Sequence, residues 1–322
     1  MTRIQEVLLK LETSYLGTPY YISGNALYSA LARRLSEETK RHLQVSAGMF
    51  VPGEHGGFPD AHSQSGGVSF FGTGLRPVER YDDLFVFRDM AQRWLSDTRP
   101  RDAHNTHPLQ EFSTTAGYAP TRSFGRPPEK RITKRTVSWY VHCYVHLDEP
   151  TGQTTFPFPA CMFDGLRLGG ARNYGFGLME CVETRCVDLS DLAYDRLETA
   201  DAYQLELLTP YVTASEYPDA DDQSIPWWWD GEGDLRTRSS TLARGDDIYP
   251  LETVDHGQVV GYAGSDPIQT AKNGLLRVGT HSQLGFGEFR LRPAEDDRVP
   301  DRQRTQAAEP TSKPHASPGG HR

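Results

Sequence analysis

A twelve-residue pattern occurs twice in this chain, at residues 166–177 and again 110 positions later at residues 276–287. Both copies read Leu-Arg-aliphatic-Gly, then five variable residues, then Gly-Phe-Gly. A repeat at a fixed offset indicates one structural unit used twice, and glycine at matched positions indicates backbone that a side chain would obstruct. The repeat therefore predicts two related halves, each of which ends in a glycine-rich loop.

The length of 322 residues suits two domains of ordinary size. No apolar run approaches the roughly 18 residues that a membrane span needs, and the first six residues lack a signal-peptide pattern. We therefore expect a cytoplasmic protein with no membrane partner. The four cysteines have no C-x-x-C spacing, which argues against a zinc ribbon or a disulfide scaffold.

The net charge is -9, and only six of the 34 basic residues are lysine. An acidic, lysine-poor chain is typical of a cytoplasm at high salt, where carboxylates keep the surface hydrated. A GC-rich genome that favours arginine codons gives the same composition. The source is therefore halophilic or simply GC-rich.

The first half contains four segments of predicted regular structure. Residues 4–12 alternate well enough to predict a strand, and apolar residues recur at helical spacing from Ser23 onward. Residues 136–147 are β-branched and aromatic and predict a central strand. Residues 178–187 predict the strand that closes this half. Long irregular stretches within about 48–128 predict loop insertions, which are functional or mobile.

The second half repeats this order after a short acidic link at 188–199. Residues 204–208 predict a strand, Asp266 and Pro267 open a helix, and residues 288–292 alternate as the last strand. Beyond Pro293 the composition predicts a disordered tail. The expected fold class is α+β, with two tandem ferredoxin-like domains at 1–187 and 200–292, the fold of RNA-recognition motifs.

The glycine loops suit an RNA backbone, because successive bare N–H groups can line a concave surface that receives phosphate oxygens. In the variable part, Arg172 and Tyr174 supply a guanidinium and an aromatic face, and His281 supplies a donor. Phe176 and Phe286 are interpreted as core anchors. The alternative is that each loop only makes a tight turn between a helix and a strand.

A second signal is a basic stretch that runs from Arg122 to Arg135 just before the aromatic strand. Basic residues beside Trp139 and Tyr140 suit a surface that follows an RNA backbone and stacks its bases. A solvated charged face is the alternative interpretation.

The paired glycine loops resemble those of the RAMP superfamily of CRISPR-associated proteins. Ile-Ser-Gly-Asn-Ala-Leu at 22–27 and Leu-Leu-Thr-Pro at 207–210 add to the likeness. A first half with its own glycine loop is similar to the branch that holds the five-prime handle of the guide RNA in interference complexes. This resemblance implies a noncatalytic subunit that binds guide RNA (crRNA) and other effector subunits, without a metal or a small-molecule cofactor. The long insertion after Gly48 departs from the family pattern.

RNA contacts are expected from the loops and the basic stretch, at Gly169, Gly170, Arg172, Tyr174, Gly175, Gly177, Gly279, His281, Gly285, Gly287, Lys130, Arg131, Lys134 and Arg135.

Two catalytic alternatives stay open. The resemblance also covers guide-processing endoribonucleases, in which histidine serves as general acid or base, and the candidates here are His42 and His281. A metal-dependent nuclease is the third hypothesis, because acidic clusters bind magnesium when they lie on adjoining strand ends. Its candidate ligands are Asp219, Asp221 and Asp222, or Asp246 and Asp247, and the pair His104 and His107 is a weaker zinc candidate.

Overall fold

The computed structural model describes residues 2–13, 15–17, 21–52, 75, 77–88, 121–122, 139–148, 156–218, 220, 222, 229–230, 235–244, 246–277, 279 and 281–295. Most of the insertion expected at about 48–128 and nearly all of the expected tail lie outside these residues and remain predictions. The expected start of the insertion is wrong, because Gly48–Pro52 form a strand that pairs with the central strand of the first sheet.

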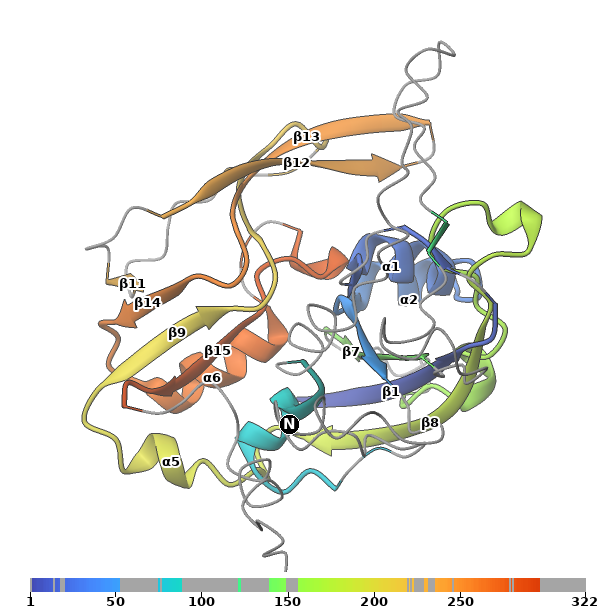
Figure 1. The fold of residues 1–322 in the computed structure, drawn as a ribbon. Coiled ribbons are helices and arrows are strands. Elements are labelled where there is room, and N and C mark those ends of the chain that lie inside the picture. The colour runs from blue at the N-terminus through green and yellow to red at the C-terminus, as the bar shows by residue number, and fades with distance from the viewer. Residues whose placement is uncertain are drawn as a thin grey trace, which may run out of the picture.

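The first half is built on an antiparallel sheet (Figure 1). Its strand order is β3 (Tyr21–Ile22), β5 (Gly48–Pro52), β7 (Trp139–Leu147), β1 (Arg3–Leu11) and β8 (Met179–Asp188), and β4 (Leu43–Val45) also pairs with β7. The register places Gln5 opposite Val145 on one side and Cys186 on the other. The strands predicted at 4–12 and 178–187 are therefore confirmed, and the strand predicted at 136–147 is confirmed over its described residues, 139–147.

One face of this sheet is covered by α1 (Gly24–Ala32), followed by the shorter α2 (Glu37–His42). Ser23 caps α1, because its side chain accepts a hydrogen bond from the N–H of Ala26 at 3.3 Å. Leu27 and Leu31 are buried in the core beneath the helix. The amphipathic helix predicted from Ser23 is confirmed as far as Ala32, whereas its expected continuation through Leu35 to Arg41 is a separate helix, α2, capped by Ser36.

The opposite face of the first sheet is also covered. The 3₁₀ turn η1 (Tyr81–Phe85) and the residues that follow it pack against this face, where Phe87 joins Leu8 and Tyr140 in a buried cluster. A sheet with both faces covered offers no open β-surface to a ligand in its central part. A ligand can therefore reach this sheet only at its edges and loops.

A second antiparallel sheet follows, in the order β11 (Trp229–Asp230), β14 (Val259–Tyr262), β9 (Tyr203–Leu207) and β15 (Phe289–Pro293). The helix α6 (Pro267–Leu276) packs against it, and Asp266 caps that helix by accepting from the N–H of Gln269 at 2.9 Å. The strands predicted at 204–208 and 288–292 and the helix opened by Asp266 are confirmed.

A separate three-stranded sheet has the order β10 (Tyr211–Ser215), β13 (Asp247–Val254) and β12 (Thr237–Arg244). The sequence analysis did not anticipate it. It follows β9 in the chain, where the first half has α1, and Figure 1 shows it extending across toward α1. The remaining elements are the pair β2 (Tyr15–Leu16) and β6 (Thr121–Arg122) and the short helix α5 (Asp195–Glu198).

The two halves share one hydrophobic core. Ile4 and Tyr144 of the first sheet belong to the same buried cluster as Leu205 and Phe289 of the second sheet. The connecting segment also contributes buried side chains to this cluster, at Leu189, Leu192, Tyr194 and Leu197. The halves are thus packed together, in a mixed α+β architecture. No helix in the described part of the chain is both long and apolar enough to cross a membrane.

Candidate nucleic-acid interface

The two glycine loops have the same backbone conformation at four matched positions. Each contains a 3₁₀ turn, η6 (Arg172–Tyr174) and η7 (Ser282–Leu284). The positive φ angles agree in pairs: 89° at Gly169 and 109° at Gly279, 51° at Ala171 and 63° at His281, 93° at Gly175 and 86° at Gly285, and 70° at Gly177 and 77° at Gly287. The sequence repeat is therefore a structural repeat, which extends to the non-glycine residues Ala171 and His281.

Two threonines anchor the loops in the same way. Thr13 Oγ1 accepts a hydrogen bond from the N–H of Leu178 at 2.9 Å, and Thr209 Oγ1 accepts one from the N–H of Glu288 at 2.9 Å. Leu178 and Glu288 each directly follow Gly-Phe-Gly, and each threonine follows the first strand of its half. The sequence analysis missed this pair. The only available signal was a threonine two residues after the end of each first strand.

Several loop glycines are explained by close packing. A Cβ on Gly177 would lie 1.8 Å from the carbonyl oxygen of Leu168, and a Cβ on Gly279 would lie 2.6 Å from the ring of Tyr211. A Cβ on Gly285 would lie 2.9 Å from the backbone N of Ala47. A Cβ on Gly175, in contrast, would meet nothing within 4 Å. Gly175 is therefore the position where the first loop is open.

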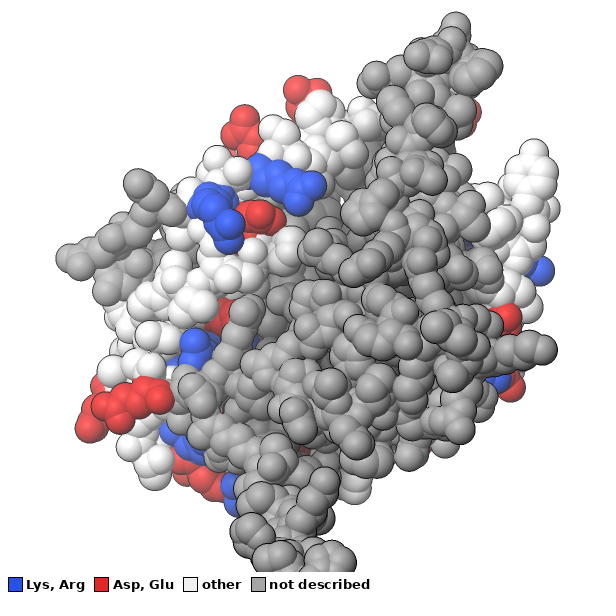
Figure 2. Space-filling view, in the orientation of Figure 1, with Lys and Arg blue, Asp and Glu red and all other residues white. Residues whose placement is uncertain are grey.

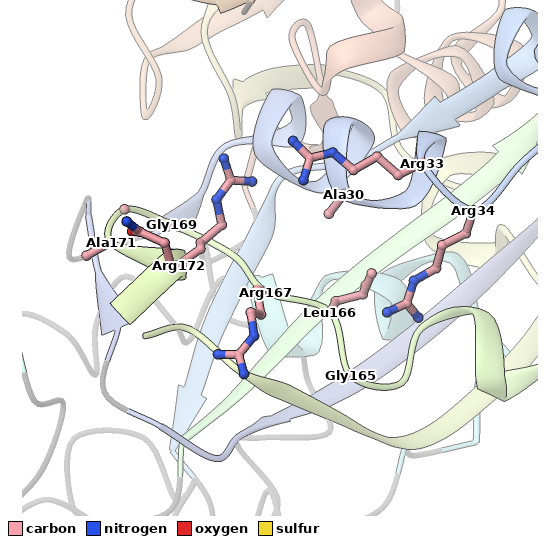
Figure 3. A pocket seen from close by; sticks show the side chains of 11 residues that line it. Ala30, Arg33, Arg34, Gly165, Leu166, Arg167, Gly169, Ala171 and Arg172 are labelled. Atoms are coloured by element: carbon pink, nitrogen blue, oxygen red, sulfur yellow. The ribbon is translucent and has the colours of Figure 1, made fainter. Parts of the chain in front are cut away.

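A pocket of about 640 Å³ lies between the first glycine loop and the C-terminal end of α1. We call it the arginine pocket, because Arg33, Arg34, Arg167 and Arg172 line it and no lining residue is acidic. Figure 3 shows the guanidinium groups of Arg33 and Arg172 extending toward the same part of the pocket. Four arginines and no acidic side chain among the described lining residues favour an anionic ligand here.

The arginines of this pocket differ in how far they are already engaged. Arg34 Nη1 donates to the carbonyl oxygens of Met162 at 3.1 Å and Asp164 at 2.5 Å. Within the described part of the chain, the side chains of Arg33, Arg167 and Arg172 have no hydrogen-bond or ion-pair partner. Three guanidinium groups are thus available to a ligand, and Arg34 holds the pocket wall in place.

The backbone of the first loop adds further donors. The N–H groups of Tyr174 and Gly175 donate to the carbonyls of Ala171 and Arg172 at 2.9 and 3.2 Å. The N–H groups of residues 169–173 make no backbone hydrogen bond to any described residue. Successive free N–H groups beside left-handed residues form an anion-binding concavity. At the loop tip, Tyr174 is 80% exposed.

The second glycine loop lines another pocket, of about 770 Å³, on the other side of α1. We call it the junction pocket, because it lies where the two halves meet. Its lining comprises Asn25, Tyr28, Ser29, Ala32, Glu37, Lys40, Arg41, Tyr217, Leu242, Arg244 and residues 281–284. The repeat therefore places one pocket on each flank of a single helix.

The two candidate catalytic histidines have different surroundings. His281 lies in the junction pocket, its Nε2 is 2.7 Å from Ser215 Oγ, and its ring meets that of Tyr217 edge-on at 5.1 Å between centroids. Burial lowers the pKa of His281, so its imidazole is neutral at neutral pH. His42 ends α2 and does not line this pocket. The structure thus brings only His281 into a pocket.

The interpretation of Trp139 and Tyr140 as base-stacking residues is wrong. Each is 4% exposed, because β7 is a central strand whose two faces are both covered. The basic residues Lys130, Arg131, Lys134 and Arg135 lie outside the described residues, so their role remains a prediction. On the face shown in Figure 2, the described basic and acidic side chains are interspersed.

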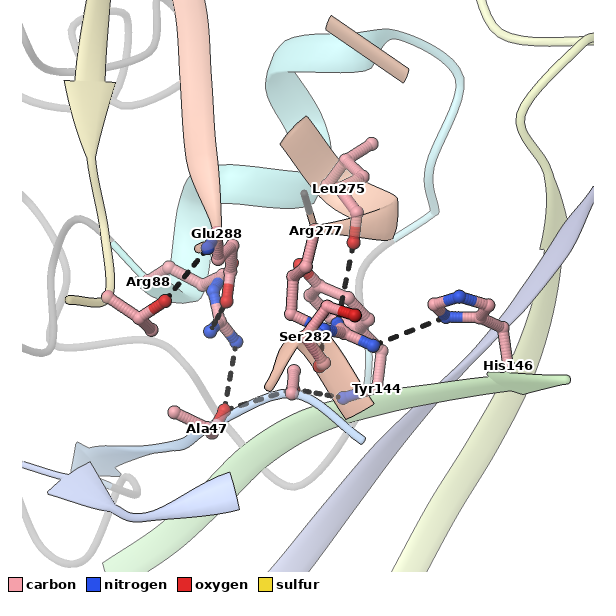
Figure 4. Close-up of polar contacts among 10 residues, drawn as sticks. Ala47, Arg88, Tyr144, His146, Leu275, Arg277, Ser282 and Glu288 are labelled. Carbon is pink, nitrogen blue, oxygen red and sulfur yellow. Dashed lines mark hydrogen bonds and ion pairs between the residues drawn. The ribbon is translucent and has the colours of Figure 1, made fainter. Parts of the chain in front are cut away.

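The two arginines at the matched position before each loop differ in solvent exposure. Arg167 is exposed at the arginine pocket, whereas Arg277 is 5% exposed. Arg277 Nε donates to the carbonyl of Ser282 at 3.0 Å, and its guanidinium lies 5.4 Å from the centre of the Tyr144 ring (Figure 4). Arg277 therefore fixes the second loop against the first half and is unavailable to a ligand.

The acidic candidates do not form a metal site in the described part of the chain. No three His, Cys, Asp or Glu side chains there lie close enough together to hold an ion. Asp222, Asp246 and Asp247 are exposed. Asp219, Asp221, His104 and His107 lie outside the described residues.

Comparison of the sequence with family models and curated proteins gives no match. No protein-family model matches the chain, and no curated protein matches it with significant similarity. Function must therefore be inferred from the two pockets.

Proposed function

We propose that this protein is a noncatalytic guide-RNA-binding subunit of a CRISPR interference complex, which acts in the cytoplasm together with other effector subunits. We further propose that its halves are tandem ferredoxin-like domains. The order β5-β7-β1-β8 in the first half and β11-β14-β9-β15 in the second supports this proposal. Numbered in chain order among these four strands alone, both read 2-3-1-4, the strand order of a βαββαβ unit.

The arginine pocket is the observation that carries the proposal. Three guanidinium groups without partners among the described residues line one pocket together with residues 169–173, whose N–H groups make no backbone hydrogen bond to any described residue. Arginine binds phosphate oxygens through two parallel N–H donors, and free N–H groups in a nest bind the same oxygens. The exposed ring of Tyr174 offers a face for a base beside this phosphate site.

The experiment is fluorescence anisotropy with a labelled transcript of the CRISPR repeat, without added metal. We expect submicromolar binding by the full chain, and at least tenfold weaker binding by the triple variant Arg33→Ala, Arg167→Ala, Arg172→Ala, since each phosphate contact contributes about 1 kcal/mol or more. The matched control replaces Arg3, Arg236 and Arg238, three exposed arginines that line neither pocket. Its affinity should stay within twofold of wild type. Absence of RNA binding at both low and high salt would overturn the proposal.

The same transcript tests the endoribonuclease alternative, which the position of His281 favours. A neutral imidazole at the wall of a pocket can take a proton from a ribose 2′-hydroxyl. Site-specific cleavage that disappears in His281→Ala or in His42→Ala would show that the protein processes guide RNA, and would overturn the noncatalytic proposal. We expect an uncleaved transcript.

A further inference from the structure

We propose that the junction pocket is a nucleobase site that accepts bases with an exocyclic amino group, namely adenine, cytosine or guanine, and discriminates against uracil. The inference rests on the proposed function, because the base would belong to the same RNA strand whose phosphate lies in the arginine pocket.

Two amide oxygens of the junction pocket, those of Asn25 and Gln283, have no hydrogen-bond partner among the described residues. Asn25 Nδ2 already donates to the carbonyl of Ala243 at 2.9 Å, which leaves its Oδ1 free. Gln283 Nε2 donates to the carbonyl of Lys40 at 2.9 Å, which leaves its Oε1 free. Tyr28 Oη donates to the carbonyl of Lys40 at 2.9 Å and accepts a long hydrogen bond from Gln283 Nε2 at 3.5 Å, so it is engaged on both sides. Asn25, Gln283 and Tyr28 thus each already donate a hydrogen bond to a backbone carbonyl.

A ligand that matches these acceptors must bring N–H donors. Adenine, cytosine and guanine each carry an amino group with two N–H bonds, whereas uracil offers a single ring N–H and two carbonyl oxygens. The two N–H bonds of an amino group can pair both amide oxygens, whereas the single N–H of uracil leaves one of them unpaired, which costs affinity. The pocket therefore favours amino-bearing bases.

The charged groups of the junction pocket suit the sugar-phosphate part of the same nucleotide. Lys40, Arg41 and Arg244 line the pocket, against the single carboxylate of Glu37. Glu37 is paired with Lys40 at 2.5 Å, and its side chain is 85% exposed, so it lies at the rim. The volume of about 770 Å³ is in the range of pockets that enclose a small ligand.

Helix α1 connects this pocket to the arginine pocket. Asn25, Ser29 and Ala32 face the junction pocket, and Ala30 and Arg33 face the arginine pocket. A helix is about 10 Å wide, so a strand of a few nucleotides can cross it. One RNA strand can therefore place a phosphate on one flank of α1 and a base on the other.

The test is the affinity of the full chain for labelled oligo(A), oligo(C) and oligo(U) of equal length, measured by anisotropy at one salt concentration. We expect oligo(A) and oligo(C) to bind at least about tenfold tighter than oligo(U), the discrimination that a paired base edge gives. Comparing oligo(C) with oligo(U) separates the effect of the amino group from that of base stacking, because the cytosine and uracil rings are of equal size. In the double variant Asn25→Ala, Gln283→Ala, this preference should fall below twofold, while the affinity for oligo(U) stays unchanged.

The control is Asn273→Ala, which removes an asparagine of α6 outside both pockets and should keep the preference. The thermal midpoints of all variants are compared with wild type, and Asn25→Ala alone serves if the double variant unfolds. Equal affinity for the three oligonucleotides, tighter binding of oligo(U), or a preference that survives both variants would overturn the base site and leave the proposed function standing. No binding of any oligonucleotide would overturn both.

Discussion

Arg88 and Glu288 form an ion pair in which both side chains are 0% exposed. The two residues are 200 positions apart, and Arg88 also donates to the carbonyl of Ala47 at 3.2 Å. This pair connects the segment that covers the first sheet with the end of the second glycine loop (Figure 4). The loop conformation therefore depends on a buried charge pair between the halves.

Removing one partner of this pair should strongly destabilise the protein. In Glu288→Gln the Arg88 guanidinium stays buried without a counter-charge, and we expect the free energy of unfolding to fall by about 3–5 kcal/mol. Urea unfolding followed by tryptophan fluorescence measures this loss.

The double variant Arg88→Met, Glu288→Leu should recover most of the loss. Glu180→Ala, which removes the exposed partner of Lys10, should change stability by less than about 1 kcal/mol. Equal effects of Glu288→Gln and Glu180→Ala would contradict the burial of the pair.

Alanine at Gly177 and at Gly175 should have unequal effects. Both positions have positive φ, which costs alanine about 1–2 kcal/mol. At Gly177 the new Cβ would also meet the Leu168 carbonyl oxygen, whereas at Gly175 it would meet open space. We therefore expect Gly177→Ala to lower the free energy of unfolding by at least about 2 kcal/mol more than Gly175→Ala. Urea unfolding measures both free energies. Equal losses of stability in the two variants would show that the positive φ angle alone, and not the contact with Leu168, determines the cost.

Protonation of His146 should lower the stability of the folded protein as the pH falls. Burial lowers the pKa of His146 to about 4, although Asp148 acts in the opposite direction. Between this value and the ordinary pKa near 6.5, the unfolded chain binds a proton that the folded chain does not, so stability rises with pH in this window. The contribution is on the order of 3 kcal/mol. Unfolding free energies at pH 4.5 and 7 should differ by less in His146→Gln than in wild type. An unchanged difference would exclude His146 as the source.

RNA affinity should depend on salt through the arginine pocket. Each phosphate contact to a single strand contributes about 0.7 to the slope of log affinity against log salt concentration. The triple variant of Arg33, Arg167 and Arg172 should therefore reduce this slope by about 2 relative to wild type. Anisotropy titrations over a salt series give the slope. A variant with weaker binding but an unchanged slope would indicate that these arginines contact bases or act indirectly.

Local patterns in the sequence were sufficient for most elements and for the glycine loops. Apolar spacing located α1 and β1, and Asp266 and Pro267 located the start of α6, because these signals act between residues a few positions apart. The repeat with Gly-Phe-Gly indicated matched loops, and the matched φ angles confirm it. Glycine at such positions is a local requirement of the backbone, so a sequence can reveal it.

The sequence could not distinguish Arg167 from Arg277, which occupy the same place in the repeat. The two arginines differ in exposure because the second loop packs against the first half. This packing buries Arg277 beside Tyr144, whereas Arg167 stays in an open pocket. The burial of Trp139 and the pairing of Arg88 with Glu288 have the same origin. Burial and charge pairing depend on which distant segments meet in the folded chain. The sequence alone therefore determined the elements and the loop backbone, and only the tertiary structure decided which side chains of those loops remain available to a ligand.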